Sequence, residues 1–331
     1  MPAHGPAPCS TREVQHLSQN HDHESAGLNR SAALASISAA LFLLAIKAWA
    51  AWSTGSIAML GSLADTTLDL VASMATLLGV WIASQPADDK HRFGHGKAEA
   101  IAALFQIVLI SISALGIATR AIEEFLSGGR VEAADMGIGV SAVAIVVTFA
   151  LLSWQRYVIR RTRSLAIHTD SVHYQSDLLL NVAVIAALAL DQYAGLRGAD
   201  PLFGLGIALW LGWGAWNASK AVLNQLMDHE WPEEKKQHVL ELIAHNPDIS
   251  GVHDLRTRVS GNKHFVQFHV WVDANMTVRQ AHRVMDDIEA TIHAEFPEVE
   301  ILIHTDPDGL VDEVGDAGKD ILPPIRVEAT K

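Results

Sequence analysis

Four polar residues with metal-binding side chains interrupt two otherwise apolar stretches of the chain. Asp65 and Asp69 lie four residues apart in the first stretch, and His173 and Asp177 repeat this spacing in the second. Four residues turn an α-helix through about 400°, so each pair falls on one helix face, with its members about 6 Å apart along the axis. Two such helices facing each other would gather three carboxylates and one imidazole.

A divalent cation is the simplest partner for these charged groups. An Asp at the centre of a membrane helix costs about 2.5–3.5 kcal/mol on insertion scales, so it needs compensation within the protein. Three carboxylates and one imidazole form a tetrahedral set suited to Zn²⁺ and to borderline ions such as Fe²⁺ or Cd²⁺. The alternative is that each acid pairs with a basic side chain; Lys47 and Arg120 are the basic residues well inside the first five apolar segments.

The apolar segments that carry these residues predict a membrane domain. Each of six segments reaches the roughly 20 residues that a helix needs to cross a bilayer. They span residues 29–52, 56–84, 98–126, 136–157, 165–190 and 201–223. The chain is 50% hydrophobic with a mean hydropathy of +0.20, which indicates six transmembrane helices joined to a soluble part.

The charges of the loops predict the orientation of this domain. Lys90, Arg92 and Lys97 flank the loop after the second segment, and four arginines lie between residues 156 and 163. The positive-inside rule places these loops in the cytoplasm. Because six crossings return the chain to its starting side, we expect both termini there too, in a multi-pass membrane protein.

The C-terminal part predicts a cytoplasmic α+β domain. Residues 233–246 and 277–296 have helical patterns, and residues 252–259, 264–273 and 299–305 have strand patterns. The order αββαβ predicts a three-stranded sheet with both helices on one face. Residues 228–331 carry −11 of the total formal charge of −13, which disfavours nucleic acid as a partner.

These patterns divide the chain into four parts. We predict a flexible histidine-containing tail over residues 1–28, the membrane domain over 29–227, the α+β domain over 228–308 and a second flexible tail over 309–331. His16, His21 and His23 of the first tail either bind metal weakly or are incidental. The first 28 residues contain no apolar run, so no cleavable signal peptide is expected. Cys9 is the only cysteine, which excludes an internal disulfide.

Two further clusters have metal-ligand chemistry. In the loop after the second apolar segment, Asp88, His91 and His95 lie close in sequence and form either a metal site or an ordinary solvated loop. In the α+β domain, histidines and one carboxylate from several elements predict a metal site that is mononuclear or binuclear, the alternative being surface histidines. These residues are His238, His253, His269, His304 and Asp306.

Four segments of the chain resemble the cation diffusion facilitator family, in its bacterial branch of zinc and ferrous-iron efflux transporters. They are GSIAMLGSLADTTLD at residues 55–69, PADDKHRFGHGKAE at 86–99, HYQSD at 173–177 and VHDLRTR at 252–258. The resemblance covers about residues 29–308. It implies a homodimer of six-helix protomers with a metallochaperone-like cytoplasmic domain, which exports Zn²⁺, and also Fe²⁺ or Cd²⁺, in exchange for protons.

The resemblance also assigns residues. Asp65, Asp69, His173 and Asp177 match the transport site, and the loop cluster and the cytoplasmic cluster match two further metal sites. Lys97 and Asp228 match a charge interlock between protomers. No prosthetic group is implied, because the metal is substrate and regulatory ion.

Other function classes share some of these ligands. A passive metal channel or a membrane metal sensor would use the same site without proton coupling. An intramembrane metallohydrolase would need an open coordination position and a general base. Since all four ligands are assigned and no HExxH-type motif is present, we do not expect an enzyme.

Overall fold

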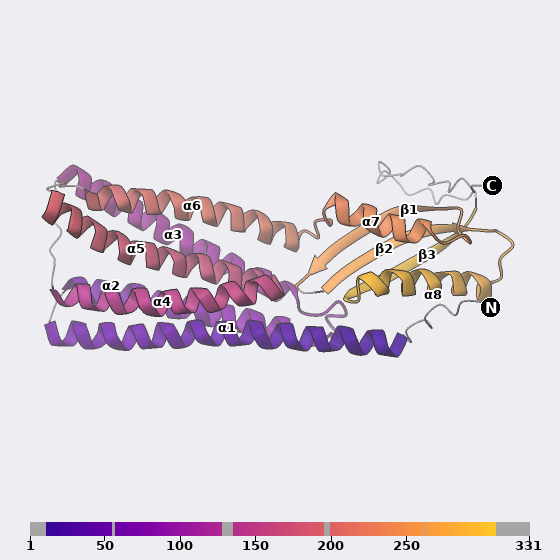
Figure 1. The fold of residues 1–331 in the computed structure, drawn as a ribbon, viewed down its shortest axis with the longest axis horizontal. Coiled ribbons are helices and arrows are strands. Elements are labelled where there is room, and N and C mark those ends of the chain that lie inside the picture. The colour runs from indigo at the N-terminus through magenta and orange to yellow at the C-terminus, as the bar shows by residue number, and fades with distance from the viewer. Residues whose placement is uncertain (1–10, 55–56, 128–134, 195–198, 262, 309–331) are drawn as a thin grey trace, which may run out of the picture. The chain divides into compact units, whose positions relative to one another are not determined.

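The computed structural model describes residues 11–54, 57–127, 135–194, 199–261 and 263–308. The chain divides into a helical unit, Ser25–Leu226, and a second unit that contains Met227–Lys331 together with Met1–Glu24. We call the second one the α+β unit. Figure 1 shows long helices in the first and a small sheet with two helices in the second.

The helical unit is built from six long helices that lie where the apolar segments predict them. They are α1 (Thr11–Thr54), α2 (Ile57–Ala83), α3 (Lys97–Ser127), α4 (Asp135–Thr162), α5 (Leu165–Ala194) and α6 (Ala199–Leu226). The first begins well before residue 29, so residues 11–28, predicted as part of a flexible tail, are helical. Residues 11–26 contain neither proline nor glycine, which removes the strongest breakers of a helix. The rest of that tail and residues 309–331 lie outside the described residues.

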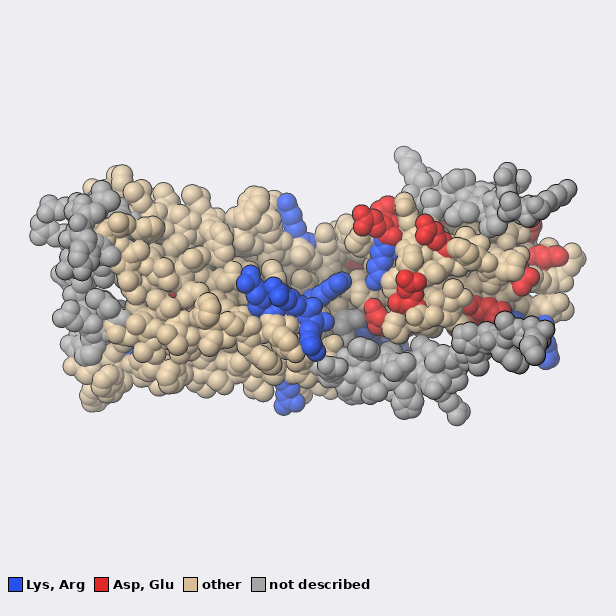
Figure 2. All heavy atoms as spheres, in the orientation of Figure 1, with Lys and Arg blue, Asp and Glu red and all other residues tan. Residues whose placement is uncertain are grey.

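Among the described residues, four helical stretches are long and apolar enough to cross a membrane. They are Ser25–Ser53, Asp65–Ala83, Lys97–Leu126 and Gly139–Thr162. Six crossings therefore stay a prediction. Figure 2 shows that the visible face of the helical unit has few charged side chains, apart from Lys and Arg gathered at one end.

Small residues allow these helices to pack closely. A Cβ added at Gly79 of α2 would lie 2.4 Å from Cβ of Ala102 on α3, so the two backbones approach at a distance that excludes a side chain. Alanines from α3 and α6, such as Ala103 and Ala215, are likewise buried in a common core. Close approach of this kind is the usual way in which membrane helices gain contact.

The α+β unit has the predicted order of elements. It consists of α7 (Glu233–Ala244), β1 (Gly251–Ser260), β2 (Lys263–Val272), α8 (Val278–Glu295) and β3 (Val299–Pro307). The sheet order is β1-β2-β3; β1 and β2 are antiparallel, whereas β2 and β3 are parallel and connected through α8. Val266, Phe268 and Val270 of β2 form one core with residues of both helices. Both helices therefore cover one face, and the other face of the sheet is left for polar residues.

Candidate metal centres

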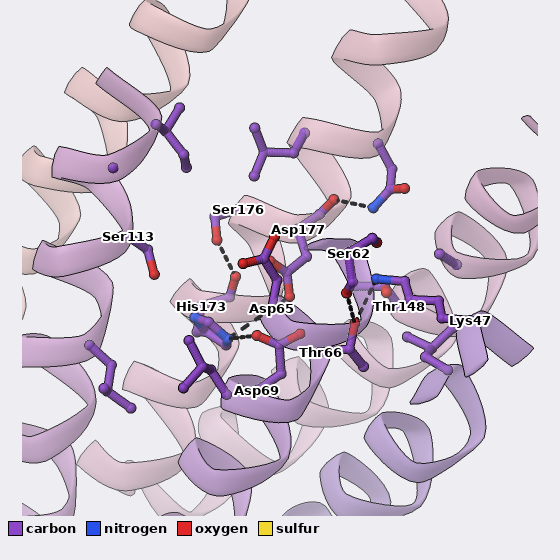
Figure 3. Close-up of a pocket in the computed structure, with 18 of the residues that line it drawn as sticks. Lys47, Ser62, Asp65, Thr66, Asp69, Ser113, Thr148, His173, Ser176 and Asp177 are labelled. Atoms are coloured by element: carbon purple, nitrogen blue, oxygen red, sulfur yellow. Dashed lines mark hydrogen bonds and ion pairs between the residues drawn. The ribbon is translucent and has the colours of Figure 1, made fainter. Parts of the chain in front are cut away.

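Helices α2 and α5 bring an imidazole and two carboxylates together inside the helical unit. Nε2 of His173 lies 2.8 Å from Oδ1 of Asp69 and 4.0 Å from Oδ2 of Asp177 (Figure 3). The side chains of His173, Asp69 and Asp177 are 9%, 17% and 28% exposed. One ligand atom from each lies within 4.8 Å of the other two, which is compatible with a shared ion. The spacing of four residues places His173 and Asp177 on one face of α5, as predicted.

Asp65 is the fourth predicted ligand, and it lies outside this group of three. It is exposed to a cavity of about 540 Å³ whose walls also include Asp69, His173 and Asp177. In Figure 3 its carboxylate points into the same space as that of Asp177. A side-chain movement within the cavity would therefore be needed for Asp65 to join the other three.

Basic side chains form no ion pair with these acids in the described part of the chain. Lys47 and Arg120 both line the cavity. However, Nζ of Lys47 donates to Oγ1 of Thr66 at 2.6 Å, and no ion pair within 4.0 Å joins either basic residue to the acids among the described residues. The alternative of separate acid–base pairs is therefore not what the structure has.

The loop between α2 and α3 brings its three candidate ligands together. Nδ1 of His91 lies 3.1 Å from Oδ1 of Asp88, and Nε2 of His95 lies 3.1 Å from Nδ1 of His91 and 3.5 Å from Oδ2 of Asp88. Gly94 adopts a φ of 79°, which lets the loop turn back between the two histidines. The backbone N–H of His91 donates to Asp88, and this hydrogen bond lowers the pKa of the carboxyl group. Asp88 is therefore ionised at neutral pH and able to bind a cation.

In the α+β unit, three histidines form a row across the sheet. His269 of β2 is the cross-strand partner of His253 on β1 and of His304 on β3. Asp306 lies against all three: its carboxylate oxygens are 3.2 Å from Nε2 of His253, 2.9 Å from Nδ1 of His269 and 3.2 Å from Nε2 of His304. Burial, and the neighbouring His269, lower the pKa of His253. A neutral imidazole keeps the lone pair that a metal requires.

The structure places one further carboxylate beside this row, which the sequence reasoning missed. Oδ2 of Asp254 lies 3.8 Å from Nε2 of His269. Strict alternation along β1 would direct Asp254 and His253 to opposite faces. The register of β1 shifts between His253 and Arg256, and Asp254 has a φ of 50°, so the backbone irregularity turns its side chain toward the histidines. The adjacency of His and Asp in the sequence is the only local signal.

His238 was predicted to belong to this metal site, but the structure does not bring it to the cluster. It lies on α7, where Nε2 is 2.7 Å from Oε1 of Glu295 on α8. Helix α7 packs through Val239 and Ile243 onto the face of the sheet opposite to the histidine row. The sequence pattern identified His238 as a histidine near the others but could not show which face of the sheet its helix covers.

The two residues predicted to interlock protomers fall in different units. Lys97 begins α3 and donates from Nζ to the carbonyl of Leu226 at 3.2 Å. Asp228 lies 3.7 Å from the guanidinium of Arg258. Each therefore has a partner within its own unit.

Comparisons with known proteins cover both units. A family model described as the cation efflux transmembrane domain matches residues 33–227, and one described as the cation efflux protein, cytoplasmic domain, matches residues 231–308. The cation-efflux pump FieF of Cronobacter sakazakii is 41% identical over 292 residues, which are 88% of this chain and 96% of that protein. FieF of Escherichia fergusonii is 42% identical over 284 residues, 86% of this chain and 94% of that protein. The chain belongs to the cation diffusion facilitator family.

Among solved structures, the metal-bound C-terminal domain of the CzcD transporter from Thermotoga maritima matches 25% of this chain and 100% of that chain, with 23% identity and a TM-score of 0.23. Membership in the family confirms two predictions from the sequence: the resemblance itself, and a transporter rather than an enzyme. This member of the cation diffusion facilitator family is a membrane transporter that exports cations.

The separation of His238 from the histidine row leads to a prediction about its titration. The hydrogen bond with Glu295 raises the pKa of His238 above its ordinary value of 6.5. A raised pKa in the folded state means that the pair stabilises the fold below about pH 6.5, and that this contribution is lost as pH rises through the folded pKa. We expect Glu295→Gln to lower the pKa of His238, measured by NMR of the histidine-labelled full chain.

Glu241→Gln is the matched control, because Oε2 of Glu241 is 3.8 Å from Nδ1 of His238 and should change the pKa less. A pKa of His238 that stays the same in Glu295→Gln would contradict the pairing.

Proposed function

We propose that this transporter exports divalent transition-metal cations from the cytoplasm in exchange for protons, with Zn²⁺ as the main substrate and Fe²⁺ and Cd²⁺ as further ones. The observation that supports this most directly is the convergence of Asp69, His173 and Asp177 at the wall of one cavity. Two carboxylates and an imidazole, with the carboxylate of Asp65 in reach, provide oxygen and nitrogen donors for a tetrahedral ion.

The types of ligand support a transition metal over Mg²⁺ or Ca²⁺. Hard cations are bound by oxygen ligands alone and keep more of them, six to eight for Ca²⁺. An imidazole nitrogen instead favours Zn²⁺ and its neighbours among the first-row metals. His173 is therefore the residue that we assign to selectivity.

Proton coupling follows from competition for the same lone pairs. Nε2 of His173 and Oδ1 of Asp69 are 2.8 Å apart, so a proton between them occupies two positions that a metal ion would also use. Metal binding requires a neutral imidazole and ionised carboxylates, and hence releases protons. When the site is open to the cytoplasm, metal displaces protons. When it is open to the opposite side, protons displace metal.

The proposed orientation places the basic loops in the cytoplasm. Arg160 and Arg161 lie in the last turn of α4, and the α2–α3 loop contains Lys90 and Arg92. This distribution favours an inner-membrane protein with its cytoplasmic side at these loops and with both termini inside. We further propose a homodimer, consistent with the match of residues 231–308 to the family's cytoplasmic domain, and retain Lys97 and Asp228 as its interlock.

The remaining clusters are proposed as regulatory metal sites. Asp88, His91 and His95 would hold an ion at the cytoplasmic mouth of the helical unit. His253, His269, His304 and Asp306 would hold ions in the α+β unit, where occupancy reports the cytoplasmic metal concentration. His238 is not included, because it lies against Glu295.

The first test removes one carboxylate of the transport site. We expect Asp69→Ala or Asp177→Ala to reduce metal-driven proton flux in proteoliposomes to the level of protein-free vesicles, since a site that lacks one carboxylate ligand holds the ion much more weakly. Asp89→Ala is the control, because its side chain is fully exposed in the loop. Full transport by folded Asp69→Ala or Asp177→Ala would refute the shared site. Metal flux that ignores an imposed pH gradient would instead favour a passive channel.

The second test concerns selectivity. We expect His173→Asp to reduce the preference for Zn²⁺ over harder ions such as Mn²⁺, because the only nitrogen ligand is replaced by oxygen. The measurement is competition among Zn²⁺, Fe²⁺, Mn²⁺ and Cd²⁺ for flux under a fixed proton gradient. An unchanged order of preference would mean that the cavity, and not the ligand type, selects the metal.

The third test addresses the α+β unit. Asp306 contacts all three histidines of the row, so Asp306→Ala should abolish high-affinity binding of Zn²⁺ to this unit. His238→Ala should leave binding unchanged. Zinc equilibrium titration of full-length protein carrying Asp177→Ala and His95→Ala isolates these sites. Equal losses in both variants would contradict the assignment.

A further inference from the structure

The cavity at the transport site extends to only one side of it. On α5, which begins at the α4–α5 connection, the cavity is lined by residues from His173 onward, up to Asn181. On α3 it is lined from Leu109 to Arg120, again away from the α2–α3 loop. The contributions of the other helices follow the same rule: Leu43 and Lys47 of α1, Ser62 to Asp69 of α2, and Ser141 to Thr148 of α4. The site is therefore open away from the basic loops.

On the other side of the site, the path toward the basic loops is filled by a buried polar cluster. Oδ2 of Asp170 accepts hydrogen bonds from Oγ of Ser36 at 2.6 Å and from Nε2 of Gln155 at 2.7 Å, and Oδ1 accepts from Nε2 of Gln106 at 2.8 Å. Nε2 of Gln106 also donates to Oγ1 of Thr76 at 2.5 Å. We call these five residues the Asp170 cluster.

The Asp170 cluster takes one residue from each of five helices. Ser36 belongs to α1, Thr76 to α2, Gln106 to α3, Gln155 to α4 and Asp170 to α5. On every one of these helices the cluster residue lies closer to the basic-loop end than the cavity-lining residues do. None of the five is more than 1% exposed. The cluster therefore forms a continuous polar layer directly beneath the transport site, and it excludes water.

A second set of contacts links this layer to the ligands. Tyr174 follows His173 on α5; its hydroxyl group donates to the carbonyl of Ser36 at 3.1 Å and shares a hydrogen bond of 2.9 Å with Ser73 on α2. Asp170 precedes His173 by three residues, about 4.5 Å along the helix axis. A displacement of α5 relative to α1, α3 and α4 would therefore move His173 and stretch or break the bonds of the Asp170 cluster.

The hydrogen bonding of the cluster is incomplete, which favours rearrangement. Oε1 of Gln106 and Oε1 of Gln155 are buried and have no hydrogen-bond partner among the described residues. A buried carbonyl without a hydrogen-bond donor is unfavourable, because water would supply the donor that it lacks. A second arrangement, in which water enters the layer, would give these two oxygens hydrogen-bond donors. The open arrangement is therefore favoured by hydration of Gln106 and Gln155.

We propose that the Asp170 cluster is the gate on the basic-loop side of the transport site, and that it must separate for metal to enter from that side. The proposal rests on the proposed function for its direction of transport. Its geometry, a sealed polar layer on one side of the ligands and a cavity on the other, does not depend on which metal is carried. Asp170, Gln106 and Gln155 are thus positioning residues that hold one of two orientations of the site.

The experiment measures access to water on both sides of the gate. Cys9 is the only cysteine, so Cys9→Ser gives a cysteine-free background. Ala166→Cys reports from one turn beyond Asp170 on α5, where the side chain is fully buried, and Ser113→Cys reports from the wall of the cavity. The rate of reaction of each thiol with a water-soluble maleimide is measured on full-length protein in nanodiscs.

We expect Gln155→Ala, alone and with Asp170→Asn, to raise the rate at Ala166→Cys and to lower it at Ser113→Cys. Loss of one or two hydrogen bonds shifts a two-state ratio by about ten-fold, which sets the expected change. Ser153→Ala is the matched control, because its hydroxyl only donates to the carbonyl of Phe149 on the same helix, and it should change neither rate.

Reaction rates that change in opposite directions at the two thiols distinguish a gate from a cluster that only stabilises the fold. A rise at both positions would mean a loosened fold and would overturn the proposal, as would no change at either. If the glutamine variants fail to fold, Ser36→Ala removes a single donor and should give smaller changes in the same directions. Transport retained by Asp177→Ala would refute the proposed function while leaving the thiol result intact, so the two failures are distinguishable.

Discussion

The cost of holding carboxylates among apolar helices shapes the whole helical unit. Each buried acid that the structure describes there accepts hydrogen bonds from neutral donors. Asp170 accepts from Ser36, Gln106 and Gln155, and Glu99 accepts from Asn29 and Ser164. Such hydrogen bonds are strengthened in a medium of low dielectric constant. They connect helices that are distant in the sequence and so fix how the bundle closes.

The carboxylates at the cavity wall differ from the buried acids in their interaction partners. Among the described residues, the carboxylates of Asp69 and Asp177 form ion pairs with His173, and Asp65 faces the cavity without joining this group. A transported ion must be bound well enough to enter and weakly enough to leave, so an incomplete ligand set suits the proposed transport site. The buried acids hold the structure, whereas the acids at the cavity wall are the ones that we propose bind the substrate.

In the α+β unit, the candidate metal ligands lie on a sheet rather than on helices. Three neighbouring strands place His253, His269 and His304 side by side, and Asp306 lies against all of them. Cross-strand neighbours are held by backbone hydrogen bonds, so this row is preformed in a way that the ligands on two separate membrane helices are not. We therefore propose the preformed row for metal retention and sensing, and the site divided between two helices for release.

Local structure and the types of ligand follow from the amino-acid sequence alone. Apolar length predicted the positions of α1 to α6, alternation predicted the strands, and the spacing of four residues placed His173 and Asp177 on one helix face, because these features depend on periodicity alone. Periodicity does not show which faces of these elements pack together, and this depends on the tertiary structure.

The fold separates His238 from the histidine row, because α7 covers the opposite face of the sheet, and an irregularity of β1 brings Asp254 to the row. It also leaves Asp65 outside the group of Asp69, His173 and Asp177, and assembles the Asp170 cluster from five helices. Each of these outcomes depends on packing between segments far apart in the chain, and packing is a property of the whole fold.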